Sequence, residues 1–202
     1  MSNEPAPAEQ PFVLPSGDIP MWMIGKPDVL GALAFASAAH RFQRRKYTLQ
    51  PYIYHPMSVA TRLYLFYKDE VGINCPVPML QAALLHDTVE DTGVTFGEIE
   101  KTFGFDVAAL VYWLTDLPMP GTNRETRKRL NAERLAHAPS AALIVKHFDL
   151  EDNTESIELY DPKFAKTYIP EKERVRKFTE VAVRDAWLVS TRDYQAKAGP
   201  LA

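Results

Sequence analysis

Residues 84–92 have the sequence Leu84-Leu85-His86-Asp87-Thr88-Val89-Glu90-Asp91-Thr92, in which an apolar approach leads into four ionisable side chains. On a helix, His86 and Glu90 are four residues apart, as are Asp87 and Asp91, so all four can meet at one end of a cavity. Burying them without partners would be costly, and a divalent cation held by His86 and Asp87 is the simplest compensation. Glu90 and Asp91 then remain for water and substrate. The alternative is a solvated acidic turn, which gives His86 no role.

The length and composition of the chain predict one domain with a sizeable core, because 46% of its 202 residues are hydrophobic. A formal net charge of -3 argues against a general nucleic-acid-binding protein and favours a compact small-molecule ligand. Cys75 is the only cysteine, which excludes an internal disulfide and suits a reducing compartment. The sequence has neither a secretory signal nor roughly 18 consecutive apolar residues, so we expect a cytoplasmic protein with no membrane partner.

Apolar residues recur at three- and four-residue spacings along most of the chain, and no period-two pattern appears, so the sequence predicts an all-α fold. Prolines spread through residues 1–20 favour a mobile tail or a surface strap. Thr95 and Glu98 have the spacing of a capping box at the start of a helix. The predicted helices cover approximately residues 28–43, 56–66, 76–92, 95–103, 107–116, 124–137, 141–153 and 171–188.

A basic and aromatic loop is predicted at residues 44–52, where Pro51 is poorly placed for a helix interior. Its charges either are solvated or face an anionic ligand. His55 begins the next helix, where a lone histidine more often caps or packs than binds a metal. The apolar run at 141–145 leads into residues 146–153, and Asp149 ends this apolar approach.

Taken in chain order, His55, His86-Asp87 and Asp149 resemble the pattern of the HD-domain metal-dependent phosphohydrolases. More narrowly, Pro51-Tyr52-Ile53-Tyr54-His55-Pro56 and residues 82–92 are similar to the hydrolase domain of RelA/SpoT-type alarmone enzymes and to the small, Mesh-like alarmone hydrolases. The likeness covers about residues 28–157. It implies a single compact helical HD-domain bundle at 23–190, a flexible Pro-rich tail at 1–22 and a C-terminal tail at 191–202. The length of the chain leaves no room for a synthetase half, so we expect a stand-alone hydrolase.

The resemblance also implies an activity, namely removal of the 3′-pyrophosphate from (p)ppGpp- or (p)ppApp-type alarmones. The cofactor would be a divalent metal, most readily Mn²⁺, since manganese tolerates mixed nitrogen and oxygen ligands. By this resemblance, the metal ligands are His55, His86, Asp87 and Asp149, the residues handling water and protons are Glu90 and Asp91, and the nucleotide-binding residues are Arg45, Lys46 and Asn153.

Two departures from the family pattern lie next to residues that are expected to bind the nucleotide. Residues 47–50 form a loop that is one residue longer than usual and lacks its glycine, which can displace Arg45 and Lys46. Leu150-Glu151-Asp152 replaces a basic residue and a Leu-His pair, and its two acids repel a polyphosphate unless they point away. Two alternatives therefore stay open: an HD-domain phosphatase acting on another nucleotide, such as NADPH or a nucleoside monophosphate, and a regulatory module that binds a nucleotide without turnover.

Overall fold

The computed structural model describes the backbone of residues 10–198 and the side chains of residues 10–189. Within this range the regular structure is helical, apart from one isolated bridge between Arg44 and Pro51, so the all-α prediction is confirmed. Short 3₁₀ turns are η1 (Ser16–Asp18) and η2 (Met21–Met23), and η3 (Phe66–Val71) is a π-helical continuation of α2. The α-helices are α1 (Pro27–Ala39), α2 (Tyr54–Leu65), α3 (Val77–Leu85), α4 (Thr88–Asp91), α5 (Phe96–Phe103), α6 (Phe105–Leu114), α7 (Arg124–Leu135), α8 (Ser140–Tyr160) and α9 (Pro162–Ala198).

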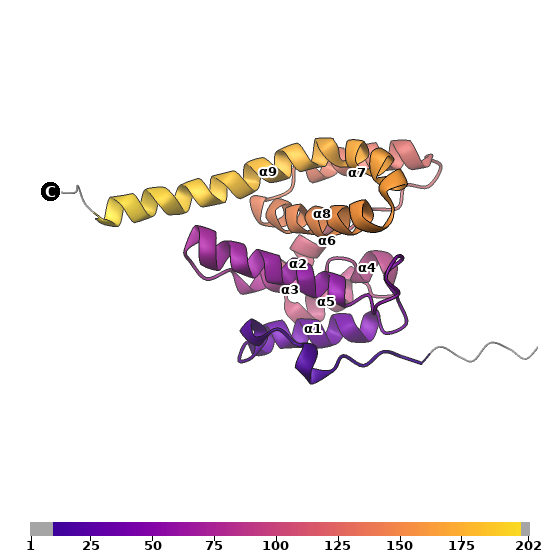
Figure 1. Ribbon diagram of the computed structural model, residues 1–202, viewed down its shortest axis with the longest axis horizontal. Coiled ribbons are helices and arrows are strands. Elements are labelled where there is room, and N and C mark those ends of the chain that lie inside the picture. The colour runs from indigo at the N-terminus through magenta and orange to yellow at the C-terminus, as the bar shows by residue number, and fades with distance from the viewer. Residues whose placement is uncertain (1–9, 199–202) are drawn as a thin grey trace, which may run out of the picture.

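The helices form two groups that meet in the middle of the molecule (Figure 1). One group contains α1, α2, α3 and α5, and the other contains α7, α8 and α9. Both α2 and α3 pack against α8, and α6 contacts α3 and α8. Apolar side chains from both groups, such as Leu63, Leu84 and Val145, are completely buried in one shared core. This packing brings the start of α2, the end of α3 and the middle of α8 to one place.

The helix predicted through residues 76–92 is interrupted, and that part of the prediction is wrong. Helix α3 ends at Leu85, and α4 begins at Thr88. The side chains in between bond to carbonyl groups that a continuous helix would need: His86 Nδ1 lies 2.8 Å from the Ala83 carbonyl oxygen, and Thr88 Oγ1 donates to the Leu85 carbonyl oxygen at 2.7 Å. Such local competition ends a helix. It leaves His86 and Asp87 in a turn rather than on a helical face.

The start of α5 has the predicted capping box, which is confirmed. Thr95 Oγ1 accepts a hydrogen bond from the Glu98 backbone N–H at 3.2 Å, and Glu98 Oε2 accepts one from the Thr95 backbone N–H at 2.8 Å. These bonds satisfy donors that the first turn of a helix leaves without partners. The signal could be found in the sequence because both partners are local.

The described part of the predicted N-terminal tail, residues 10–22, is a strap on the surface of the helices. Phe12 N–H donates to the Arg41 carbonyl at 2.8 Å, and the Trp22 ring stacks on Tyr64 with ring centroids 4.4 Å apart. The Tyr54 hydroxyl donates a hydrogen bond to Asp18. Of the two interpretations of this segment, a surface strap therefore describes residues 10–22, while residues 1–9 lie outside the described range.

Helix α9 is longer than the helix predicted at 171–188. It begins at Pro162, where Asp161 Oδ1 accepts a hydrogen bond from Phe164 N–H at 3.0 Å, and it includes Pro170. It also continues to Ala198, past the domain limit predicted at residue 190, while residues 199–202 of the predicted C-terminal tail are not described. Although long, α9 is rich in charge, and no helix in the described part of the chain is apolar enough over a sufficient length to cross a membrane.

Candidate active site

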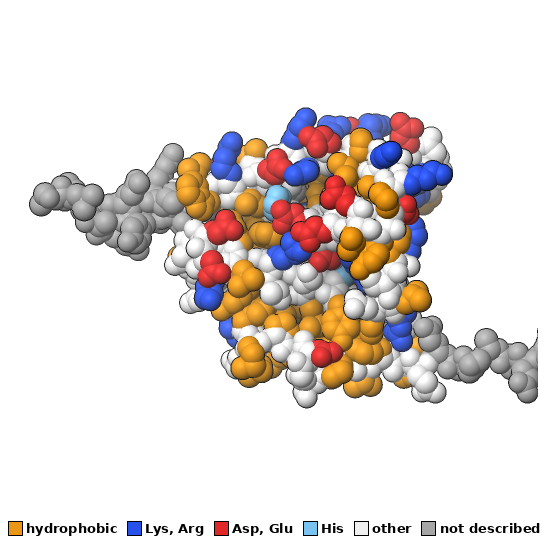
Figure 2. Space-filling model, viewed as in Figure 1, with side chains coloured by type: hydrophobic (Ala, Val, Ile, Leu, Met, Phe, Trp, Pro, Cys, Tyr) orange, Lys and Arg blue, Asp and Glu red, His pale blue; other side chains and the backbone are white. Residues whose placement is uncertain are grey.

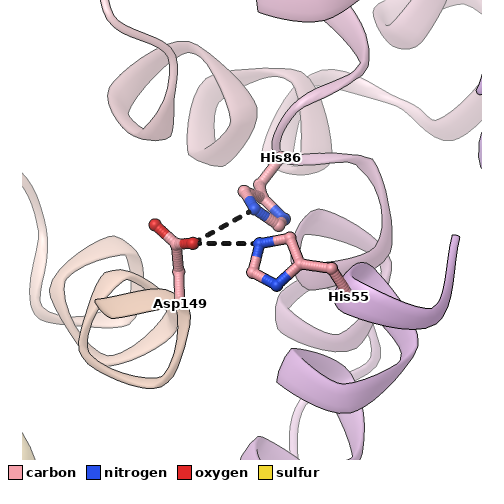
Figure 3. A group of neighbouring side chains, drawn as sticks. All are labelled: His55, His86 and Asp149. Atoms are coloured by element: carbon pink, nitrogen blue, oxygen red, sulfur yellow. Dashed lines mark hydrogen bonds and ion pairs between the residues drawn. The ribbon is translucent and has the colours of Figure 1, made fainter. Parts of the chain in front are cut away.

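Three buried side chains from distant parts of the chain meet where α2, α3 and α8 converge (Figure 3). His55 lies in the first turn of α2, His86 directly follows α3, and Asp149 lies in the middle of α8. One ligand-type atom from each lies within 4.8 Å of the other two. Asp149 Oδ1 is 3.2 Å from His55 Nε2 and 3.5 Å from His86 Nε2. The fold thus gathers two imidazoles and a carboxylate around one point.

Asp87 adds a second carboxylate to this cluster. Its Oδ2 atom lies 2.9 Å from His86 Nε2 and 3.6 Å from His55 Nε2, and the Tyr52 hydroxyl donates to the same oxygen at 2.5 Å. Burial alone would raise the pKa of Asp87, but the imidazoles of His86 and His55 hold it far below its usual value. Asp87 therefore stays ionised at neutral pH.

The hydrogen bonds on the outer nitrogen of each histidine determine which nitrogen faces the centre. His86 Nδ1 is 2.8 Å from the Ala83 carbonyl, and His55 Nδ1 is 2.6 Å from Asp152 Oδ2. Both partners accept hydrogen bonds while Asp152 is ionised, so each Nδ1 carries a proton and each Nε2 faces the centre. Burial would lower the pKa of both imidazoles, but the carboxylates beside them raise it above the usual value, so a cation that binds at Nε2 must displace a proton.

A divalent cation fits this arrangement. The buried His86 Nε2 makes no directed hydrogen bond to any residue that the structure describes, although two carboxylates stand beside it. Such an atom is costly without a partner, and a cation would serve it and the carboxylates together. The donor set of imidazole nitrogens and carboxylate oxygens is also one that divalent transition metals prefer.

Lys146 is part of the site, and the sequence reasoning missed it. Its Nζ atom lies 2.7 Å from Asp149 Oδ2, and only 16% and 5% of the two side chains are exposed. Burial would lower the pKa of Lys146, but Asp149 and Asp116 together raise it well above its usual value. The three-residue spacing to Asp149 on one helix was the available signal. Lys146 therefore supplies a permanent positive charge to one oxygen of Asp149.

Glu90 and Asp91 lie on α4 at the exposed edge of the cluster. Glu90 Oε2 accepts from the Asp116 backbone N–H at 3.0 Å, and Asp91 Oδ2 accepts from Gln43 Nε2 at 2.8 Å. Although Glu90 keeps exposed surface, the protein around its carboxyl group displaces water and raises its pKa above the usual value. A carboxyl group shifted in this direction is better suited to exchange protons near neutral pH.

The three predicted nucleotide-binding residues do not all reach the cluster. Asn153 Nδ2 donates to Asp149 Oδ1 at 2.7 Å, and Arg45 Nη1 donates to Asn153 Oδ1 at 3.3 Å. Lys46 is 73% exposed, and its Nζ atom lies over the rings of Tyr47 and Phe164 instead. In the same loop Leu49 has a φ of 56°, a left-handed conformation that glycine adopts more readily.

The two acids at positions 151 and 152 point in different directions. Glu151 Oε1 lies 3.3 Å from His147 Nε2, so this side chain points away from the cluster. An acid in that direction does not repel a polyphosphate at the cluster. Asp152 points inward, but it bonds His55 Nδ1 and lies 3.2 Å from Arg45 Nη2. Its charge is therefore compensated, and the expected repulsion by this residue does not follow. Sequence reasoning treated Asp152 as a liability and missed these contacts.

Comparison with known proteins agrees with the resemblance to HD-domain hydrolases. A family model described as HD domain matches residues 32–141, more than half of the chain. The guanosine-3′,5′-bis(diphosphate) 3′-pyrophosphohydrolase MESH1 of Xenopus tropicalis is 42% identical over 139 residues, which are 67% of this chain and 72% of the relative, and human MESH1 gives the same values. A solved structure of a metazoan ortholog of SpoT, described as hydrolysing ppGpp, superposes with a TM-score of 0.66 at 29% identity, covering 86% of this chain and 97% of that one. The chain belongs to the HD-domain family.

Proposed function

We propose that this chain is a metal-dependent hydrolase that removes the 3′-pyrophosphate from alarmones of the (p)ppGpp or (p)ppApp type. The convergence of His55, His86 and Asp149 is the observation that carries the proposal. A bound cation explains two buried imidazoles and a carboxylate at one point better than a purely structural role does. The names of the MESH1 relatives and the ppGpp hydrolysis described for the structural neighbour support the choice of substrate.

In this proposal His55, His86, Asp87 and Asp149 hold the divalent ion, which we take to be Mn²⁺. Two imidazoles and two carboxylates leave positions open on a six-coordinate ion. When bound, the ion supplies acidification of water and neutralisation of phosphoryl charge. Lys146 keeps Asp149 ionised and oriented, and Tyr52 does the same for Asp87.

The proposed catalytic residues are Glu90 and Asp91. Glu90, whose pKa is raised, exchanges a proton with the attacking water or with the leaving oxygen, a role worth typically 10²–10⁴-fold in rate. Asp91 is held by Gln43 and orients the reacting groups at the rim. Arg45 and Asn153 stand beside the cluster and bind the phosphates or base of the nucleotide, and Lys46 contributes from the loop.

We further propose that the functional unit spans residues 23–190, with residues 1–22 and 191–202 outside it. Its place of action would be the cytoplasm, where nucleotides are abundant and the buried thiol of Cys75 stays reduced. A protein limited to residues 23–190 should keep the activity of the full chain. A large loss of activity would move these limits.

A second candidate keeps the metal and changes the substrate to another nucleotide phosphate, such as NADPH or a nucleoside monophosphate. The orientation of Lys46, which lies over Tyr47 and Phe164 rather than at the cluster, favours it. Lys46 therefore does not reach the cluster, and it lies beside residues 47–50, the loop whose sequence departs from the alarmone pattern.

Product analysis distinguishes these possibilities. The purified chain is incubated with Mn²⁺ and with ppGpp, ppApp, NADPH or GMP in turn, and Glu90→Gln serves as the control for contaminating enzymes. Pyrophosphate released from an alarmone supports the proposal. Orthophosphate from NADPH or GMP alone supports the second candidate, and tight nucleotide binding without turnover identifies a regulatory module. Protein that retains its metal and is inert on every alarmone refutes the proposed function.

A further inference from the structure

The two histidines of the cluster are held in different ways. His86 Nδ1 bonds a neutral group, the backbone carbonyl of Ala83, at 2.8 Å. His55 Nδ1 bonds the carboxylate of Asp152 at 2.6 Å, and 13% of the Asp152 side chain is exposed. A charged partner constrains the imidazole more strongly than a neutral one. Only His55 therefore has an orienting group that substitution can remove.

We propose that Asp152 is a positioning residue for His55, and this inference rests on the proposed role of His55 as a metal ligand. The short bond fixes the proton on Nδ1, directs Nε2 to the centre and raises the donor strength of the ring. Loss of such an outer partner typically costs 10–100-fold in metal affinity. The departure from the family pattern at residues 150–152 is then an added support for the metal site.

The same carboxylate also connects the metal cluster to the basic loop. Arg45 Nη2 lies 3.2 Å from Asp152 Oδ2, the oxygen that bonds His55. Arg45 Nη1 donates to Asn153 Oδ1 at 3.3 Å, and Asn153 Nδ2 donates to Asp149 Oδ1 at 2.7 Å. Since Asp149 Oδ1 is 3.2 Å from His55 Nε2, the contacts form a closed ring. Arg45 neutralises Asp152 and is itself held at the edge of the cluster.

The position of Asp152 follows from the geometry of α8. Asp152 and Asn153 are three and four residues after Asp149, so all three share one face of the helix. Helix α2 packs against α8 and presents His55 to that face. Glu151, in contrast, is directed to His147 on another side of α8. The neighbouring acids thus provide a natural pair of test and control.

Metal affinity tests the proposal without any substrate. Protein freed of metal with EDTA is titrated with Mn²⁺ by isothermal calorimetry at constant pH, comparing the wild type with Asp152→Ala and Asp152→Asn. Glu151→Gln is the matched control, because it also removes one negative charge from α8. We expect the Kd for Mn²⁺ to rise 10–100-fold in Asp152→Ala and by a smaller factor in Asp152→Asn, which keeps an acceptor for Nδ1–H. Glu151→Gln should stay within about twofold of the wild type.

A second readout separates positioning from general structural damage. In the Zn²⁺-loaded protein, zinc on Nε2 leaves the proton on Nδ1 in every variant, so ¹H–¹⁵N spectra should report the hydrogen bond of that proton. The His55 Nδ1–H should exchange slowly with solvent in the wild type and in Glu151→Gln, and this signature should be weakened or lost in Asp152→Ala. An Asp152→Ala protein that binds Mn²⁺ as tightly as the wild type and keeps the His55 signature overturns the proposal. If Asp152→Ala does not fold, an unchanged Kd in Asp152→Asn overturns it instead.

The outcome is also distinguishable from failure of the proposed function. A chain that hydrolyses no alarmone, yet loses Mn²⁺ affinity on substitution of Asp152, keeps the positioning role and rejects the alarmone substrate. A wild-type chain that binds no divalent ion overturns the positioning role directly.

Discussion

Replacing Lys146 by methionine should destabilise the metal-free protein strongly. Methionine is of similar length and apolar, so the change removes the charge 2.7 Å from Asp149 Oδ2 with little change in volume. Removing one partner of a buried ion pair costs about 3–5 kcal/mol. His55 and His86 lie within 3.5 Å of the other oxygen of Asp149 and offset part of the loss when protonated. We therefore expect the lower end, about 3 kcal/mol in the free energy of unfolding.

Saturating Mn²⁺ should reduce this loss, because a cation in the cluster again places positive charge beside Asp149. The assay is urea denaturation of wild type and Lys146→Met, each with EDTA and with Mn²⁺. Lys128→Met is the matched control: Lys128 Nζ is 2.7 Å from Glu171 Oε2, but the pair is 30% and 29% exposed, so its loss should be below about 1 kcal/mol in both buffers. A Lys146→Met loss equal to that of the control, or one that Mn²⁺ leaves unchanged, would refute the reasoning.

Four further substitutions test separate parts of the site and fold. Asp87→Ala should lose bound metal, since it removes a proposed ligand, whereas Glu90→Gln should keep metal and lower kcat by about 10²–10⁴-fold; equal metal loss in both, measured by elemental analysis, would contradict these roles. Lys46→Ala should raise KM about two- to fivefold with kcat unchanged, because an exposed lysine contributes modestly to binding, and an unchanged KM would remove the loop from the pocket. Thr95→Ala should cost about 1 kcal/mol and lower Tm by roughly 2–4 °C, because the α5 cap loses its acceptor; a thermal melt with no shift would show that the box is not stabilising.

The fold class could be predicted because three-four periodicity is a local property of the chain, and the same is true of the Thr95–Glu98 capping box. The break at His86 and Asp87 could not, because it depends on side chains taking helix carbonyls, and the sequence pattern there is also compatible with a continuous helix. The start of α9 at Pro162 could not be predicted from local pattern, because a proline such as Pro170 usually interrupts a helix, whereas this helix continues past it.

Part of the candidate site could also be predicted, since His55, His86, Asp87 and Asp149 are brought together in the expected place; their service as ligands stays a prediction. The direction of Asp152 could not be predicted, because it depends on how α2 rotates against α8. Figure 2 shows acidic and basic side chains intermixed over the half of the molecule formed by α7, α8 and α9. On such a surface, the charge of a residue does not indicate whether its side chain faces solvent or the interior. That direction depends on how the helices pack.

Helix α3 ends at Leu85 and His86 directly follows it, so the C-terminus of that helix adjoins the cluster. A helix end of this kind carries roughly half a negative charge from aligned peptide dipoles. Together with Asp87 and Asp149, it favours a cation beside His86 Nε2. The cation is therefore expected to bind to the cluster without the help of a nucleotide. The supply of free metal in the cell would then set the fraction of enzyme ready to degrade its substrate.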